Sequence, residues 1–193
     1  MTENEWLICE DAASMFDNVW EQEPFVSLAS KFTRGSTDEE WQSNLEVEKP
    51  LYRFYLASCR NIWQLLPQEE SRKGVELAEE FVAGNISWEK VSDYNYYTEG
   101  AAFNIDYDVE PKQIEKWVKE VESVSGKTFQ GLLSSERAYS ELGPRGILLD
   151  AAYFADHAMM YPCLTPKGPP HKHTHFMFAG LLREYIDYPS KKS

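Results

Sequence analysis

The sequence predicts an all-α fold, a single-domain bundle of about seven to nine helices with long irregular connections. Apolar residues recur at helical spacing along most of the chain, and residues typical of helix ends stand at the borders of these stretches. Strand-like alternation is scarce, and 102–109 is the best candidate for β-structure. One helical domain is expected over 1–193, with 21–49 as an insertion and 188–193 as a tail.

The clearest pattern lies in residues 51–84, which predict two helices joined at Pro67 with the remaining chain packed around them. One face of the first helix carries apolar residues at steps of four or three, namely Leu51, Tyr55, Cys59, Ile62 and Leu66. Three more widen this face: Tyr52, Leu56 and Trp63. A helix with such a broad apolar face belongs in the interior. Pro67 disfavours helix at Leu66, so the first helix is expected to end there.

The second helix is expected over 69–83. Glu69 and Glu70 lie in its first turn, where the helix dipole favours negative charge. Gly84 supplies the left-handed residue that ends many helices. Because the connection is short, the two helices are expected to be antiparallel neighbours.

Four stretches share a recognisable pattern: TENEWLICEDAASMF, YRFYLASCRNIWQLL, EESRKGVELAEEFVAG and LLREYIDYP. They resemble a bacterial family of uncharacterised helical proteins, whose members share a C-R-x-I-W-x-L-L helix, an S-R-x-x-V-E-x-A-E helix and a closing L-L-R-x-I-x-x-P. The matching pieces cover about half of the chain, while 21–49 is longer than in the family and 94–140 matches poorly. No activity is assigned to the family, so the resemblance implies a helical fold and carries over no catalytic residue.

Local cap signals predict the helices near the N-terminus. Thr2 and Glu5 form a capping-box pattern that opens a short helix. Asp11 is expected to cap a second helix, whose apolar face is Met15, Phe16, Val19 and Trp20. A third short helix is expected to start at Ser36 or Thr37.

The second half of the chain alternates helical patterns with breaks. Ser87 is expected to cap a helix, and the stretch 93–110 that follows is the least periodic of the chain. Pro111 suits the first position of a helix that runs to Gly126. Beyond it, the pattern predicts short helix over 134–142, a well-packed helix over 148–159, a loop over 162–170 and a last helix over 171–186.

Composition limits the partners that the chain can have. It holds 32 acidic and 19 basic residues, a formal net charge of −13, which argues against direct nucleic-acid binding because phosphate contacts need clustered Lys and Arg. No apolar run is long enough to span a bilayer, so no membrane partner is expected. The three cysteines are widely spaced and no secretory signal is visible, so a cytoplasmic location with reduced thiols is expected. The oligomeric state is left open.

The most suggestive local chemistry is a histidine cluster near the C-terminus. His171 and His175 share a face if their segment is helical, a spacing seen in metal sites. His157 and Asp150, or Asp156, on the preceding helix are candidates for the remaining ligands of a divalent metal, the one cofactor considered. The alternative is an exposed, basic helix start after a proline-rich loop.

No catalytic constellation emerges from the sequence. Asp156 and His157 are adjacent, and adjacent helix residues point about 100° apart, so they do not form an acid–base pair. Asp150 and His157 share a helix face, but no nucleophile motif accompanies them, and Cys163 lies in a loop without a neighbouring base. The chain also lacks a G-x-G-x-x-G motif or P-loop, so no nucleotide cofactor is expected.

Two further patterns have ordinary structural explanations. Four residues fit positions 1, 3, 5 and 12 of a calcium loop, namely Asn104, Asp106, Asp108 and Glu115, but Val109 stands where the loop needs glycine. An acidic loop before a helix explains the same residues. Four tyrosines either line a recognition surface or cover an adjacent helix pair: Tyr94, Tyr96, Tyr97 and Tyr107. The packing interpretation is favoured because most large side chains serve packing.

These observations favour a non-catalytic, cytoplasmic helical module that binds another protein, with 21–49 and the tyrosine stretch as its expected contact surfaces. The alternative is a metal-binding protein or metal-dependent enzyme that uses the C-terminal histidine cluster. A third hypothesis is an acidic decoy of a nucleic-acid-binding protein, which requires the N-terminal acidic residues to form one continuous face.

Overall fold

The protein is an all-α bundle. The structure, a computed structural model, describes residues 1–21, 38–133, 136–160 and 175–188. Within these ranges the chain forms 8 α-helices with short 3-10 turns between some of them, and no strand is present. The predicted fold class is therefore confirmed. No helix of the described ranges is long and apolar enough to cross a membrane.

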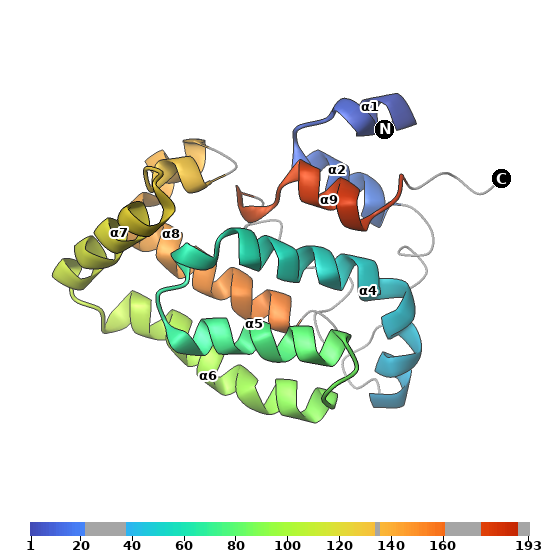
Figure 1. Cartoon of the computed structure of the whole chain (residues 1–193), viewed down its shortest axis with the longest axis horizontal. Coiled ribbons are helices and arrows are strands. Elements are labelled where there is room, and N and C mark those ends of the chain that lie inside the picture. Colours follow the sequence, from blue (N-terminus) through green and yellow to red (C-terminus); the bar gives the residue numbers. More distant parts are fainter. Residues whose placement is uncertain (22–37, 134–135, 161–174, 189–193) are drawn as a thin grey trace.

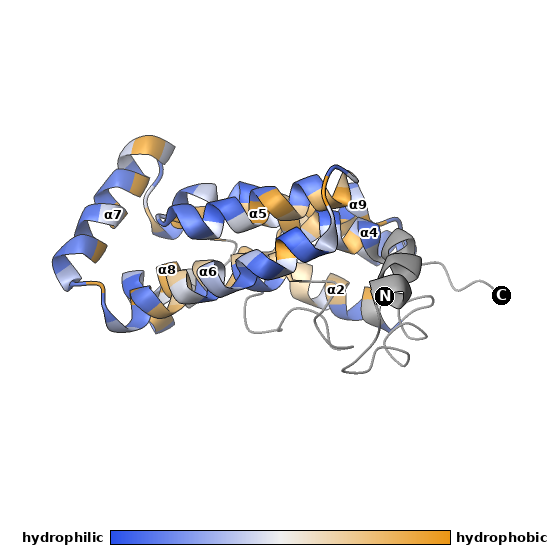
Figure 2. Cartoon of the chain, turned by 90° about the horizontal axis from the view of Figure 1, so that it is seen from below, coloured by the Kyte–Doolittle hydropathy of each residue, from blue (hydrophilic) through white to orange (hydrophobic). Residues whose placement is uncertain are grey.

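Four long helices form the centre of the bundle (Figure 1). They are α4 (Asp38–Asn61), α5 (Glu69–Val82), α6 (Trp88–Tyr107) and α8 (Glu136–Met159). Helix α8 packs against the other three, and α5 lies between α4 and α6. On the opposite side of α4 lie α9 (Ala179–Tyr185) and, next to α9, α2 (Ala12–Trp20). Helix α7 (Pro111–Ser125) projects from one end of the bundle (Figure 2).

Helix α4 carries the buried aromatic face that the sequence predicted. Tyr55 and Ile62 are at most 1% exposed, and the Tyr52 hydroxyl donates a buried hydrogen bond of 2.6 Å to the Met159 carbonyl of α8. The predicted boundaries were wrong at both ends. The helix starts at Asp38 and continues through Pro50, so residues 38–49 of the expected insertion belong to it. It ends at Asn61, because the backbone of Ile62 leaves helical geometry and a 3-10 turn (Trp63–Leu65) follows.

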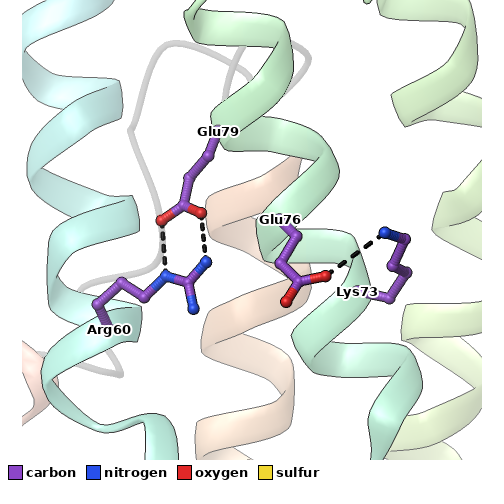
Figure 3. Close-up of polar contacts among 4 residues, drawn as sticks. All are labelled: Arg60, Lys73, Glu76 and Glu79. Atoms are coloured by element: carbon purple, nitrogen blue, oxygen red, sulfur yellow. Dashed lines mark hydrogen bonds and ion pairs between the residues drawn. The ribbon is translucent and has the colours of Figure 1, made fainter.

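The antiparallel pair of α4 and α5 is held together at its surface as well as in its core. Helix α5 has nearly the predicted bounds, and Gly84 adopts the expected left-handed φ of 83° just after it. Arg60 of α4 binds Glu79 of α5 with two parallel hydrogen bonds of 2.8 and 2.5 Å (Figure 3). This bidentate pair connects the two helices at their solvent-facing sides.

Helix α6 is where the sequence interpretation failed. The stretch 102–109 was the best candidate for β-structure, yet the helix runs unbroken from Trp88 to Tyr107. Its buried side repeats at helical spacing through Val91, Thr98, Ala102 and Ile105. Large aromatic residues occupy the opposite side and obscure this repeat, because both sides of the helix then look apolar.

Local signals predicted the remaining helix starts well. The Thr2–Glu5 capping box opens α1 (Glu3–Ile8), and the Asp11 side chain caps α2 by accepting a hydrogen bond from the Ala13 amide. Pro111 is the first residue of α7, which ends at Gly126 with a φ of 66°. Each of these signals acts within one helical turn, so the rest of the fold does not alter it.

The C-terminal helices differ from the expectation in two ways. Helix α8 has the predicted break at Gly143, where φ is 64°, but helical structure resumes directly after the break and not at the predicted position 148. The last helix was expected over 171–186, but α9 covers only Ala179–Tyr185. The reason is that the backbone of Phe178 is extended, so α9 cannot continue back into the 3-10 turn at 175–176. The predicted loop 162–170 lies outside the described residues.

Two arginines join distant helices by binding helix C-termini. Arg145 of α8 donates hydrogen bonds to the carbonyls of Ile105 and Val109, at 2.6 and 2.5 Å, at the end of α6. Arg183 of α9 likewise donates to the carbonyls of Trp6 and Cys9, at 3.1 and 2.7 Å, at the end of α1. Such contacts satisfy carbonyls that a helix leaves unpaired and place positive charge at the negative end of its dipole.

Candidate functional site

The structure brings together two of the predicted metal ligands. His175 is buried, and its Nε2 lies 3.6 Å from Oδ2 of Asp150 on α8. The His175 ring also packs on the ring of Phe176, with 4.1 Å between centroids. Two ligands are fewer than a stable metal site needs. In the part of the chain that the structure describes, no group of three His, Cys, Asp or Glu side chains is arranged to hold a metal.

The other histidines do not join this pair in the described structure. His157 stacks on Tyr153 one turn earlier in α8, with 6.2 Å between ring centroids. His171 lies outside the described residues, so the complete predicted set of His157, His171, His175 and Asp150 stays a prediction.

Asp156, the neighbouring candidate ligand, has a different environment from His157. It is 7% exposed, and its Oδ1 accepts a hydrogen bond of 2.5 Å from the Thr98 hydroxyl of α6. Burial raises the pKa of Asp156 to about 6, although the Thr98 hydrogen bond acts to lower it. Asp156 therefore holds a proton at mildly acidic pH while it joins α8 to α6.

The calcium-loop residues do not form a calcium loop. Asn104 and Asp106 lie within α6, and Glu115 lies on α7. The Asn104 side chain accepts a hydrogen bond of 3.1 Å from Gln68 Nε2 and thereby connects α6 to the segment before α5. Helical backbone at these positions prevents the oxygens from converging, as the missing glycine at Val109 indicated.

The cysteines that the structure describes have no catalytic environment. Cys59 is fully buried in α4, and burial raises the pKa of its thiol, so the reactive thiolate is suppressed. Cys9 is half-buried, and its thiol donates a weak hydrogen bond of 3.5 Å to the Asp11 carbonyl. Cys163 lies outside the described residues.

The most unusual surface is built from large aromatic side chains of α6. Tyr96, Phe103 and Tyr107 are 79%, 44% and 75% exposed. They are seven and four residues apart, so they share one side of the helix, and this side is turned away from the buried one. In Figure 1, α6 runs along the lower edge of the bundle with α5 beside it, which leaves its outer side uncovered by another described helix.

Rings of α8 extend this surface. Phe103 stacks on Tyr107 and meets Tyr153 of α8 edge to face, with 6.2 Å between centroids in both pairs. Tyr153 in turn stacks on His157. We call the surface formed by Tyr96, Phe103, Tyr107, Tyr153 and His157 the aromatic face. Each of the last four rings contacts a neighbouring ring, so the rings form one connected row.

Two exposed carboxylates of α6 lie near the aromatic face. The pKa of the Tyr153 hydroxyl is raised, first by partial burial and then by Asp106, Tyr107, Glu99 and Asp156. Two of these neighbours, Glu99 and Asp106, are exposed carboxylates seven residues apart on α6. The face therefore combines aromatic rings with an acidic border.

The packing interpretation of the tyrosines was wrong for three of the four. Tyr96, Tyr97 and Tyr107 are exposed by more than half of their surface, and only Tyr94 is half-buried, with its ring 5.1 Å from that of Tyr97. Sequence reasoning did not single out Phe103 or Tyr153. The available signal was the spacing of Tyr96, Phe103 and Tyr107, which fits a second apolar side of one helix.

The acidic-decoy hypothesis stays a prediction, because part of the acidic N-terminal region, residues 22–37, lies outside the described ranges. Comparison of the chain with protein families, with curated proteins and with solved structures gave no match. The resemblance to the helical bacterial family likewise stays a prediction.

Proposed function

We propose that the protein is a non-catalytic module that binds another protein through the aromatic face. The observation that carries this proposal is the exposure of Tyr96, Phe103 and Tyr107 on one side of a long, well-packed helix. Exposed groups of large apolar side chains mark interaction sites, and Tyr in particular supplies rigid contact area with a polar tip.

The position of α6 supports the same proposal. Its inner side is fixed between α5 and α8, including the buried bond of Thr98 to Asp156. A rigid helix that presents aromatic side chains loses little conformational entropy when a partner binds. Aromatic residues at the centre of an interface are also the ones that most often dominate binding energy.

The test compares two double variants of the full chain. Tyr96→Ser with Tyr107→Ser removes two rings of the aromatic face, and both side chains are mostly in water, so the fold is expected to persist. The matched control, Leu7→Ser with Ile8→Ser, removes two apolar side chains of α1 that are 59% and 79% exposed. Thermal unfolding verifies that all three proteins are folded.

Each protein is used to capture partners from cells that express it, and captured proteins are identified by mass spectrometry and purified for affinity measurement. We expect the α1 control to bind the purified partner like the unmodified protein. The aromatic-face variant is expected to lose at least about tenfold in affinity, as loss of central aromatic contacts typically produces. Equal affinity of the two variants would show that the partner binds elsewhere.

Metal binding is a second candidate, favoured by the buried His175 next to Asp150. This site would need His171 or His157 as a third ligand. Elemental analysis of protein purified without a histidine tag, and of its His175→Ala variant, tests the candidate. A bound divalent metal that the variant loses would support it, whereas less than about one tenth of an equivalent in both proteins would eliminate it.

A further inference from the structure

The border of the aromatic face also indicates what kind of partner fits it. We infer that the partner, given the proposed function, presents arginine or lysine side chains that lie over the rings of Phe103 and Tyr153 and pair with Glu99 and Asp106. The chemical class is thus a cationic protein segment.

The two carboxylates are available for such a partner. Glu99 and Asp106 are exposed, and neither forms an ion pair with any residue in the described ranges. Arg145 is the arginine that reaches this end of α6, but its guanidinium binds the backbone carbonyls of Ile105 and Val109. The guanidinium also reaches the backbone carbonyl of Asp106, at 3.5 Å, but it forms no ion pair with the carboxylate of Glu99 or Asp106.

The rings add a second preference for cations. The faces of aromatic rings carry partial negative charge and attract ammonium and guanidinium groups. Phe103 and Tyr153 meet edge to face, so the two rings expose differently oriented surfaces close to both carboxylates. Arginine suits this arrangement best, because its planar guanidinium can stack on a ring and bind a carboxylate at the same time.

Gly100 leaves room for the partner's backbone. It lies on the outer side of α6 between Tyr96 and Phe103, and a Cβ atom built there would meet no atom within 4 Å. Nothing in the described structure thus requires a glycine at this position, although glycine inside a helix is destabilising relative to alanine. Because this position carries no side chain, another chain can approach the backbone of α6 closely there.

A second copy of this protein fits the face less well. Self-association would bring Glu99 and Asp106 of two copies together, and each copy carries a net charge of −13. Like charges at an interface are repulsive and disfavour the complex. A basic segment of a different protein satisfies the same carboxylates.

The inference is tested by titrating the full chain with two synthetic amphipathic helices that have identical apolar sides. One carries arginine on its polar side and the other carries glutamine. Aromatic NMR resonances of Phe103, Tyr107 and Tyr153 report binding. We expect the arginine peptide to bind at least about tenfold more tightly, since it adds both ring and carboxylate contacts.

Two charge variants identify the carboxylates that are responsible. Glu99→Gln with Asp106→Asn is expected to weaken binding of the arginine peptide about three- to tenfold. The control, Glu115→Gln with Glu184→Gln, removes the same charge from exposed sites on α7 and α9 and is expected to change affinity by less than about twofold at 0.15 M salt.

Each other outcome overturns the inference in a recognisable way. Equal binding of both peptides at the face would remove the cationic preference but leave the proposed function intact. The inference would also be wrong if neither peptide bound, or if the two charge variants changed the affinity for the arginine peptide equally. Self-association that the Tyr96→Ser and Tyr107→Ser variant abolishes would identify a second copy as the occupant and replace both proposals.

Discussion

Asp156 illustrates how a single residue gains its properties from a distant partner. The sequence marked it as a candidate metal ligand beside His157, but in the structure it is buried against Thr98, 58 residues earlier in the chain. Nothing in the local sequence identifies that hydroxyl, because the contact depends on how α6 and α8 pack. Single-residue chemistry was therefore the least predictable part of the molecule.

The raised pKa of Asp156 makes stability depend on pH. The folded carboxyl keeps its proton up to about pH 6, whereas its ordinary pKa is 3.8, so stability falls as the pH rises between these values. The pKa difference corresponds to about 3 kcal/mol. Asp156→Asn removes this titrating group, so the variant should not lose stability in this way as the pH rises. In urea titrations, the free energy of unfolding of the variant minus that of the unmodified protein should therefore increase by about that amount from pH 4 to pH 7. Parallel pH profiles for the two proteins would contradict the burial of this carboxyl.

Substitution of glycine by alanine is expected to have opposite effects on stability at two positions inside helices. A Cβ atom at Gly74 of α5 would overlap the Thr98 methyl group and lie 2.7 Å from the Met159 sulfur. Gly74→Ala should therefore destabilise the protein by about 1–3 kcal/mol. Gly100→Ala places its methyl in open space and should stabilise α6 by about 0.5–1 kcal/mol. Thermal unfolding of both variants checks the pair, and a loss of stability at Gly100 would mean that the outer side of α6 is covered.

At the scale of helices, the sequence predicted the boundaries that local signals decide better than those that depend on the rest of the fold. The capping box of Thr2 and Glu5, the Asp11 cap and Pro111 act on the backbone within one turn, and all three were confirmed. The end of α4 and the start of α9 were wrong because tertiary packing and the extended backbone at Phe178 decide them. Helix α6 was misread for another reason, since it is apolar on two sides and a period-based argument assumes one.

Arg145 provides a prediction for one helix end. It binds carbonyls at the C-terminus of α6, and hydrogen bonds to charged groups contribute about 1.5–3 kcal/mol. Arg145→Met should lower stability by about that amount and speed hydrogen exchange of amides at 105–109. Arg53→Met, at an exposed arginine of α4, is the control and should change neither quantity. Unchanged exchange at 105–109 in the Arg145 variant would argue against the cap.

At the scale of the whole molecule, the fold class followed from periodicity, but the candidate site did not. The sequence showed that Tyr96 and Tyr107 are large and amphipathic, yet only the assembled bundle determines which side of α6 faces water. The rings of α8 belong to the aromatic face because α6 and α8 pack together. The two helices are far apart in the sequence, so the sequence does not indicate this contact. The net charge of −13 follows from the sequence, but the position of Glu99 and Asp106 near the ring of Tyr153 does not.

The central claim is that the outer side of α6 is open in the free protein and covered in the complex. Hydroxyl-radical footprinting of the full chain, alone and bound to its purified partner, measures this directly. In the free protein Tyr96 and Tyr107 should oxidise rapidly while buried Tyr52 stays protected. With the partner, oxidation of Tyr96 and Tyr107 should fall several-fold while that of exposed Ile8 on α1 stays the same. Unchanged oxidation of both tyrosines in the complex would contradict the claim.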